Sequence, residues 1–252
     1  MNQSIFYLAG GSAALHHAAH YLTRQGCYVA EQPGMDVTHL VLPVPSFEPD
    51  GSIKGGGPLS GLLAQLPENV TVFGGNLSCP ALSAYQKADF LQDPLYLAEN
   101  AAITAHCAVK AALAQLPVTL QSCHVLIIGW GRIGKCLAAL LKSMGAKVTV
   151  AARKDTDRAM LRALGYDTED TGTLRFSLIR YRIIFNTVPH PVLTEENVRF
   201  CSPDCLKIDL ASKPGIAGPD VIWARGLPGK DAPETSGNLI ARTCIRLAAG
   251  KE

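Results

Sequence analysis

Three glycines in the middle of the chain have the spacing of a phosphate-binding turn. They occur in Gly129-Trp130-Gly131-Arg132-Ile133-Gly134, which follows the apolar run His124–Ile128 and precedes a helix expected over residues 133–143. The first glycine permits a tight turn, the second lets the backbone approach a pyrophosphate, and the third lets the helix pack closely on the strand. The first N–H groups of such a helix face the phosphates with a partial positive charge. This context predicts a dinucleotide site, and the alternative is a plain strand-to-helix turn without a ligand.

The residues after the next expected strand indicate which dinucleotide is bound. An NAD-preferring domain places Asp or Glu about 20 residues beyond the glycines, against the ribose 2′-hydroxyl. Here the strand Lys147–Ala151 is followed by Ala152, Arg153 and Lys154, with no carboxylate at that position. A guanidinium grips a phosphate with paired hydrogen bonds, and lysine adds a point charge. The sequence therefore favours NADP(H) over NAD(H), the alternative being a solvated basic turn that precedes a helix at Asp155.

Two later strand ends are expected to line the same crevice, because ligands bind at the carboxyl ends of parallel strands. One end carries the segment 186–189, and the other carries 209–215, which includes Lys213. Lys213 is the sharpest choice for a cation that holds a substrate carboxylate, and the alternative is an ordinary surface lysine. The complete set of predicted cofactor-binding residues is Gly129, Gly131, Arg132, Ile133, Gly134, Ala152, Arg153, Lys154, Thr187, Val188, Pro189, Leu210 and Ala211.

Strand and helix patterns alternate along the whole chain, which predicts two α/β domains with mostly parallel sheets. We expect a smaller substrate domain over residues 1–99, rejoined by a C-terminal helix over 236–252. A glycine-free helix, stopped before Pro117, is expected to bridge the domains over 100–117. Residues 118–235 then form an NADP-binding Rossmann domain, with later strands at 182–186, 205–210 and 221–224.

The first half shows the same alternation. Strands are expected at 5–9, near Tyr28, at 39–44 and at 70–73, with a helix over 13–25. The strand at 39–44 runs into a loop rich in proline and glycine at the edge of the sheet where ligands bind.

Bulk properties exclude several classes of protein. The 252 residues are 48% hydrophobic and 17% charged, so the chain is not a disordered or fibrous protein. A net charge of +2, with scattered basic residues, implies neither nucleic acid nor a membrane surface as a partner. No signal peptide and no membrane-length apolar stretch are apparent, so we expect a cytoplasmic location with reduced cysteines.

Two clusters raise the question of a metal site. Cys201 and Cys205 are four residues apart, and His16, His17 and His20 recur near helical spacing, so two imidazoles could share a metal. A solvated helix face explains the histidines more simply, and no second cysteine pair follows. No metal is therefore expected.

Taken together, the motifs resemble those of the A subunit of bacterial dipicolinate synthase. The resemblance covers most of the chain and is densest in its second half. It rests on Gly-Trp-Gly-Arg-Ile-Gly (129–134), Val-Thr-Val-Ala-Ala-Arg-Lys (148–154), Phe-Asn-Thr-Val-Pro (185–189), Ile-Asp-Leu-Ala-Ser-Lys-Pro-Gly (208–215) and Leu-Pro-Gly-Lys-Asp-Ala-Pro-Glu-Thr-Ser-Gly (227–237). Five matches in order are far more specific than any one of them.

The resemblance implies oxidation of dihydrodipicolinate to dipicolinate in sporulation, with NADP as the hydride acceptor and with a partner, a flavoprotein-like B subunit. A dicarboxylate substrate requires cations or N–H donors, for which Lys213 and Thr104 are preferred over Arg132 and Lys54. A homo-oligomer is the default expectation for this class.

One departure stands at His106-Cys107, where the family usually carries Glu-Gly. His106 could replace the carboxylate as proton acceptor, or could be a packed helix residue. The alternative functions are another NADP-linked dehydrogenase or reductase of a small carboxylate, and a non-catalytic NADP-binding regulatory subunit.

Overall fold

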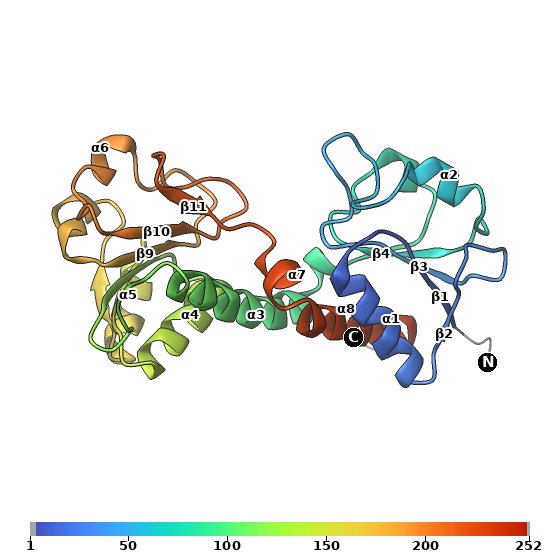
Figure 1. Cartoon of the computed structure of the whole chain (residues 1–252), viewed down its shortest axis with the longest axis horizontal. Helices are drawn as coiled ribbons and strands as arrows, with labels where there is room; N and C mark the ends of the chain where they lie inside the picture. Colours follow the sequence, from blue (N-terminus) through green and yellow to red (C-terminus); the bar gives the residue numbers. More distant parts are fainter. Residues whose placement is uncertain (1–3, 251–252) are drawn as a thin grey trace. The chain divides into compact units, whose positions relative to one another are not determined.

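The chain divides into two compact units in the computed structural model, which describes residues 4–250. The first unit is made of two segments of the chain, one that ends at Asn100 and one that begins at Pro228. The second unit comprises Ala101–Leu227. Each unit is an α/β layer structure built on its own sheet (Figure 1).

The first unit contains a five-stranded sheet in the order β2-β1-β3-β4-β5, with every neighbouring pair parallel. Its strands are β1 (Ile5–Leu8), β2 (Tyr28–Val29), β3 (His39–Val41), β4 (Thr71–Gly74) and β5 (Lys87–Asp89). The chain leaves β1 toward one edge of the sheet and returns on the other side at β3, so the strand order reverses between β1 and β3. Ligand crevices of open α/β sheets form at such reversals.

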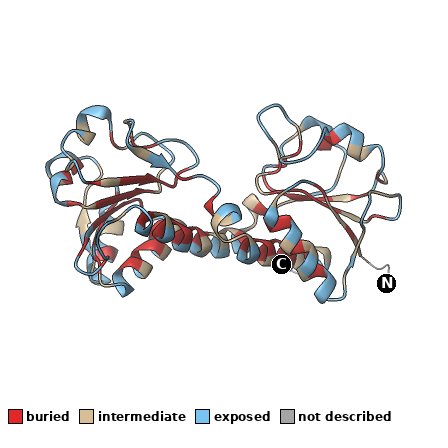
Figure 2. Ribbon diagram, in the orientation of Figure 1, coloured by how far each residue is buried: buried red, intermediate tan, exposed pale blue. Residues whose placement is uncertain are grey.

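Helices α1 (Ala13–Arg24) and α8 (Pro233–Ala248) pack against each other in this unit. Helix α1 begins at Ser12, whose side chain accepts a hydrogen bond from the backbone N–H of Leu15 at 3.2 Å. Gly237 lies so close to the Ala14 carbonyl that an added Cβ would overlap it, so a glycine is needed for this helix contact. The buried faces of the helices are red in Figure 2. Helix α2 (Leu59–Leu63) also belongs to this unit.

A half-buried histidine lies among aromatic rings in the sheet of the first unit. The ring of His39 on β3 stacks on Phe6 with centroids 4.9 Å apart and lies 5.2 Å from the ring of Phe73. Burial lowers the pKa of His39 below its ordinary value of 6.5. Because the folded state disfavours the charged imidazole, the stabilising contribution is present above pH 6.5 and is lost as pH falls below it.

We therefore expect the free energy of unfolding to fall between pH 7 and pH 5, by no more than about 1.4 kcal/mol per pH unit from this residue. Chemical denaturation at each pH measures it. His39→Leu should lose less stability than the wild type over this range, whereas His124→Gln, at an exposed position, should behave as the wild type does. Equal pH dependence in the wild type and His39→Leu would refute this role of His39.

The second unit contains a six-stranded parallel sheet in the order β11-β10-β9-β6-β7-β8. Its strands are β6 (His124–Ile128), β7 (Lys147–Ala151), β8 (Asp167–Glu169), β9 (Ile183–Asn186), β10 (Leu206–Asp209) and β11 (Val221–Trp223). Numbered along the chain within this unit, the strand order is 3-2-1-4-5-6, that of a Rossmann domain. The predicted fold class is confirmed. Helices α4 (Arg132–Ser143), α5 (Asp155–Ala163) and α6 (Glu195–Val198) belong to this unit.

The chain passes between the two units through α3 (Pro94–Leu113) and α7 (Leu227–Asp231). The expected bounds of the bridging helix, 100–117, were wrong. It begins six residues earlier because Asp93 accepts a hydrogen bond from the N–H of Leu95 at 3.2 Å and Pro94 suits the first helical position. It ends before the expected position because the N–H of Gln115 bonds to Ala112, which tightens the last turn. Within residues 4–250, no helix is both long enough and apolar enough to cross a membrane.

The unit boundaries also differ from the predicted 118–235. Residues 228–235 fall in the first unit, because they lead directly into α8, which packs on α1.

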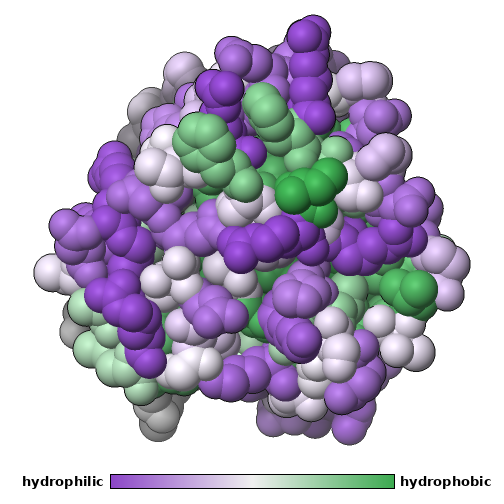
Figure 3. All heavy atoms as spheres, turned by 90° about the vertical axis from the view of Figure 1, so that its left-hand side faces the viewer, coloured by the Kyte–Doolittle hydropathy of each residue, from purple (hydrophilic) through white to green (hydrophobic). Residues whose placement is uncertain are grey.

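An apolar group lies on the surface of the second unit, visible as green atoms in Figure 3. Phe176, Ile179 and Phe200 are exposed, with Phe176 at 81%. The guanidinium of Arg175 lies 5.3 Å from the ring centre of Phe176 and 5.0 Å from that of Phe200. These cation–π contacts cover part of the ring faces and leave Ile179 in contact with water.

Candidate dinucleotide-binding site

A cavity of about 570 Å³ opens at the carboxyl ends of β6, β7 and β9, in the second unit. Its wall is formed by the glycine turn, the basic turn after β7 and the loop after β9. The lining residues are Gly129, Trp130, Gly131, Ala151, Ala152, Arg153, Lys154, Asp157, Thr171, Val188, His190, Pro191 and Val192. In this sheet β6 and β9 are neighbours at the point where the strand order reverses, so the cavity lies where Rossmann domains bind ligands.

The three glycines of the turn have three different environments. Gly129 has a φ of +107°, and its Cα faces the side chains of Thr187 and Val188 so closely that no Cβ fits. At Gly134, an added Cβ would overlap the carbonyl oxygen of Gly129. By contrast, no atom lies within 4 Å of the position of a Cβ on Gly131. Gly129 and Gly134 are therefore required by packing, and Gly131 leaves open space beside the backbone.

Helix α4 presents its amino terminus at this turn. Gly131 is its N-cap and provides no side chain to occupy the first N–H groups. The opposite face of the helix is buried through Gly134, Leu137, Ala138 and Leu141. Unoccupied N–H groups at a helix start, combined with the helix dipole, bind phosphate groups. The geometry of the turn therefore fits a pyrophosphate.

The basic turn after β7 is held in place by Arg158 on α5. Its Nη1 donates to the carbonyl oxygens of Ala152 at 2.6 Å and Arg153 at 2.9 Å, and lies 2.9 Å from a carboxylate oxygen of Asp170. Arg158 also pairs with Asp155. Because Arg158 is engaged with these acceptors, the exposed side chains of Arg153 and Lys154 are the cations at the cavity.

Buried polar groups shape the loops after β9 and β10. Asn186 is completely buried and its side chain bonds to both the N–H and the carbonyl of Val188, at 3.0 and 2.9 Å. Its Nδ2 also donates to Asp209 at 2.9 Å. The Asp209 carboxylate, itself fully buried, accepts from the N–H groups of Ala211, Gly215 and Ile216. These bonds fix the backbone of the two predicted ligand loops.

Six of the thirteen predicted cofactor-binding residues line the cavity, namely Gly129, Gly131, Ala152, Arg153, Lys154 and Val188. Thr187 lies behind the turn, where its hydroxyl donates to the Ile128 carbonyl at 3.0 Å. Leu210 and Ala211 are buried at the end of β10. Arg132, Ile133 and Gly134 follow the lining residue Gly131 in the chain, and Pro189 lies between Val188 and His190, but none of these four is part of the cavity wall.

The three residues predicted for catalysis, Thr104, His106 and Lys213, do not line this cavity. Thr104 is buried and His106 is exposed on α3. Side chains two positions apart on a helix point about 200° away from each other, so α3 presents them on different faces. Lys213 is exposed in the loop that Asp209 holds. Thr104 and His106 therefore cannot both face one ligand held by Lys213.

Sequence reasoning missed several lining residues, including Asp157, Thr171 and His190. His190 directly follows the predicted segment 187–189, so extending that loop by one residue would have included it. Thr171 follows β8, a short strand that no apolar pattern marks. Asp157 lies in the helix that was expected to begin at Asp155, although it lines the cavity together with the basic turn.

Trp130, within the glycine segment, also lines the cavity. Its ring lies edge-on to Tyr166 at 5.9 Å, and the Lys135 ammonium is 5.7 Å from its centre. Burial raises the pKa of Tyr166 above its ordinary value of 10. These contacts hold the indole at the cavity.

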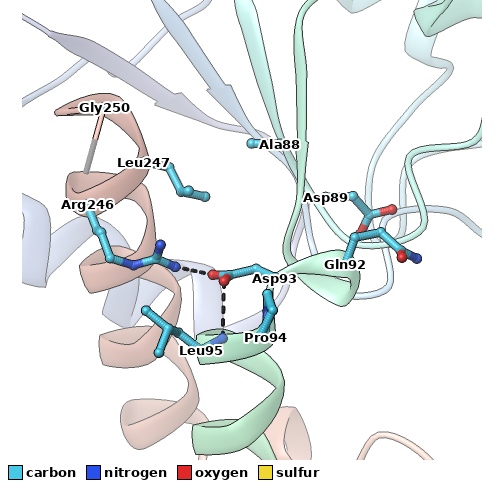
Figure 4. Close-up of a pocket in the computed structure, with 9 residues that line it drawn as sticks. All are labelled: Ala88, Asp89, Gln92, Asp93, Pro94, Leu95, Arg246, Leu247 and Gly250. Carbon is cyan, nitrogen blue, oxygen red and sulfur yellow. Dashed lines mark hydrogen bonds and ion pairs between the residues drawn. The ribbon is translucent and has the colours of Figure 1, made fainter. Parts of the chain in front are cut away.

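A second, slightly larger cavity of about 610 Å³ lies in the first unit, between the end of α8 and the segment 88–95. Figure 4 shows an ion pair in its wall, between Arg246 and Asp93. Asp93 also accepts from the N–H of Leu95 as the cap of α3. Because these groups already satisfy each other, this cavity offers less to a polar ligand than the one at the glycine turn.

Comparison with known proteins supports a dehydrogenase-type domain at this place in the chain. Residues 109–199 match the family described as D-isomer specific 2-hydroxyacid dehydrogenase, NAD binding domain. This part of the second unit is thus similar to the NAD-binding domain of dehydrogenases, and the similarity supports a nicotinamide dinucleotide as the ligand of the cavity.

Whole-chain comparisons confirm the resemblance to the dipicolinate synthase A subunit. The chain is 25% identical to the A subunit of dipicolinate synthase from Bacillus subtilis (strain 168), over 88% of this chain and 82% of that protein. The crystal structure of the corresponding A subunit from Bacillus halodurans has a TM-score of 0.86 at 21% identity, over 99% of both chains. A transhydrogenase structure from Sinorhizobium meliloti has a TM-score of 0.72 at 13% identity, over 98% of this chain and 94% of that one.

Proposed function

We propose that this protein is an NADP-dependent oxidoreductase that oxidises dihydrodipicolinate to dipicolinate, as the A subunit of a dipicolinate synthase. The observation that carries the proposal is the cavity that joins an uncapped helix start, an open glycine backbone at Gly131 and the cations Arg153 and Lys154. The choice of substrate is supported by the similarity to the A subunit of dipicolinate synthase from Bacillus subtilis.

The reaction removes a hydride and a proton from the dihydropyridine ring, yielding the aromatic dicarboxylate, NADPH and H⁺. A bound nicotinamide accepts the hydride. The work of this chain is then to bind and orient the two reactants. In this proposal Lys213 holds a substrate carboxylate. Because Thr104 and His106 lie on different faces of α3, only one of them faces the substrate: Thr104 as a hydrogen-bond donor, or His106 as the proton acceptor.

The proposal extends to the setting of the protein. We place it in the cytoplasm of a sporulating cell, as a homo-oligomer whose partner is a flavoprotein-like B subunit. The name of the Bacillus subtilis relative, which describes it as one subunit of a synthase, supports a second subunit. Two other functions share the same cofactor site: oxidation or reduction of another small carboxylate, and regulation by NADP binding without catalysis.

One assay separates these functions. The purified chain is incubated with NADP⁺ and dihydrodipicolinate, with and without the B subunit, while NADPH absorbance and dipicolinate are followed. We expect both products to appear at equal rates, and Lys213→Ala to raise KM for the substrate about tenfold or more, because a charge-assisted contact is lost. NADP⁺ binding without turnover in either mixture would refute the synthase and support the regulatory role. Turnover of a different carboxylate alone would refute the substrate assignment.

A further inference from the structure

Two histidines on α1 point their ring nitrogens at each other. His16 and His20 are four residues apart, one helical turn, and both are exposed. Their Nε2 atoms are 3.1 Å apart, with ring centres 4.6 Å apart and ring planes at 81°. This cluster lies outside the dinucleotide site, in the first unit, and the proposed oxidation does not use it.

The separation of the two Nε2 atoms suits two bonds to one metal ion. Imidazole nitrogens bind transition metals at about 2.0–2.1 Å, and two such bonds that diverge by about 98° span about 3.1 Å. An angle near 90° is typical of tetragonal copper(II) and nickel(II), and a tetrahedral zinc site needs only a slight opening of the pair. A hydrogen bond between the two rings would give the same distance, so the two explanations must be separated by experiment.

We propose that His16 and His20 form a chelating site for a divalent transition-metal ion, with copper(II) and nickel(II) bound best. No group of three or more His, Cys, Asp or Glu side chains suited to a metal comes together within residues 4–250. The metal would therefore have two protein ligands, and its other coordination positions would hold water or an oxygen anion.

Helix α1 holds the two histidines in place. Helix α1 is capped by Ser12 and buries Ala14, Leu15, Ala18 and Leu22 on its other face, where it packs on α8. Ligands held on a formed helix lose little conformational freedom on binding, which favours affinity.

The space beside the pair can accept further ligands of the metal. His16 lines a cavity of about 500 Å³ together with Gly10, Gly11 and Ser12, in the turn after β1. This turn lies at the carboxyl end of β1, next to the reversal of strand order between β1 and β3. His17 does not share this position, since its Cβ faces Gly237 on α8.

The test is a titration of the full chain with CuCl₂, NiCl₂ or ZnCl₂ by calorimetry, after accessible thiols are blocked with iodoacetamide. We expect one ion per chain. His16→Gln and His20→Gln should each weaken binding about a hundredfold, because the second ligand of a linked pair acts at high effective concentration. His17→Gln keeps the histidine pair intact and should bind as the wild type does.

Electron paramagnetic resonance of the copper(II) complex gives a second readout, with two equatorial imidazole nitrogens expected in the wild type and one in each single variant. Circular dichroism confirms that the variants fold. Unchanged affinity in both His16→Gln and His20→Gln, or a spectrum with no more than one imidazole in the wild type, would overturn the proposal. In that case the 3.1 Å contact is a hydrogen bond between imidazoles.

Discussion

Gly134→Ala is expected to lower the free energy of unfolding by about 3 kcal/mol and to abolish dinucleotide binding. The added Cβ would overlap the carbonyl oxygen of Gly129, an atom of the backbone that cannot turn aside as a flexible side chain would. Helix α4 must then move away from β6, although its Leu137 and Leu141 are fully buried. Denaturant unfolding measures the first effect, and calorimetric titration with NADP⁺ the second.

Gly131→Ala is the matched control, because it makes the same chemical change three residues away. No atom lies within 4 Å of the new Cβ, and the φ of Gly131 is −82°, which alanine adopts freely. We expect stability to change by no more than about 0.5 kcal/mol. If a pyrophosphate approaches this backbone, NADP⁺ affinity should still fall at least tenfold. Equal stability of the two variants would contradict the packing role assigned to Gly134.

The strands at the centre of the second unit could be predicted from short apolar runs in the sequence. His124–Ile128 and Lys147–Ala151 were predicted with the bounds that β6 and β7 have, because each is a short apolar run between clear turn signals. The short strands β5 and β8 were missed. Lys87-Ala88-Asp89 and Asp167-Thr168-Glu169 lie at the edges of their sheets and carry mostly polar side chains, so no apolar pattern marks them.

The start of α3 shows a second limit of pattern reading. The helix was expected from the alanine-rich stretch after residue 100, where propensity is high. Its true start depends on Asp93, which caps the helix and also pairs with Arg246 on α8. That ion pair joins positions 153 residues apart, so local sequence gives no sign of it.

The cavity at the glycine turn was easier to predict than an arrangement of Lys213 and Thr104, for a physical reason. A glycine turn and a basic turn at the ends of adjacent strands are brought together by the sheet itself, so strand order is enough to place Gly131 near Arg153. Lys213 and Thr104 lie on a loop and on a helix, and no sheet register links them. Asp209, which fixes the loop of Lys213, could be recognised only after its partners at 211, 215 and 216 were seen.

The NADP proposal depends on opposing charges at the basic turn. Arg153 and Lys154 stand at the cavity together with the carboxylate of Asp157. The cations would attract a 2′-phosphate, whereas the carboxylate would repel it and accept a hydrogen bond from a 2′-hydroxyl. Two cations against one anion favour the phosphate, in agreement with the NADP proposal.

Arg153→Ala is therefore expected to weaken NADP⁺ binding about thirtyfold, equivalent to about 2 kcal/mol, and to leave NAD⁺ binding within about twofold. Arg153→Ala combined with Lys154→Ala should bring the two affinities close to each other. Titrations with both dinucleotides measure the ratio for each variant. The matched variant Asp157→Asn removes the opposing charge from the same cavity and should raise the preference for NADP⁺ further. If Arg153→Ala leaves the ratio unchanged and Asp157→Asn weakens NAD⁺ binding, the carboxylate binds the ribose 2′-hydroxyl and the cofactor is NAD.

Arg158→Ala tests a different role at the same turn. Arg158 donates to the carbonyls of Ala152 and Arg153, so its loss should disorder the turn without removing a phosphate contact. We therefore expect this variant to bind both dinucleotides more weakly.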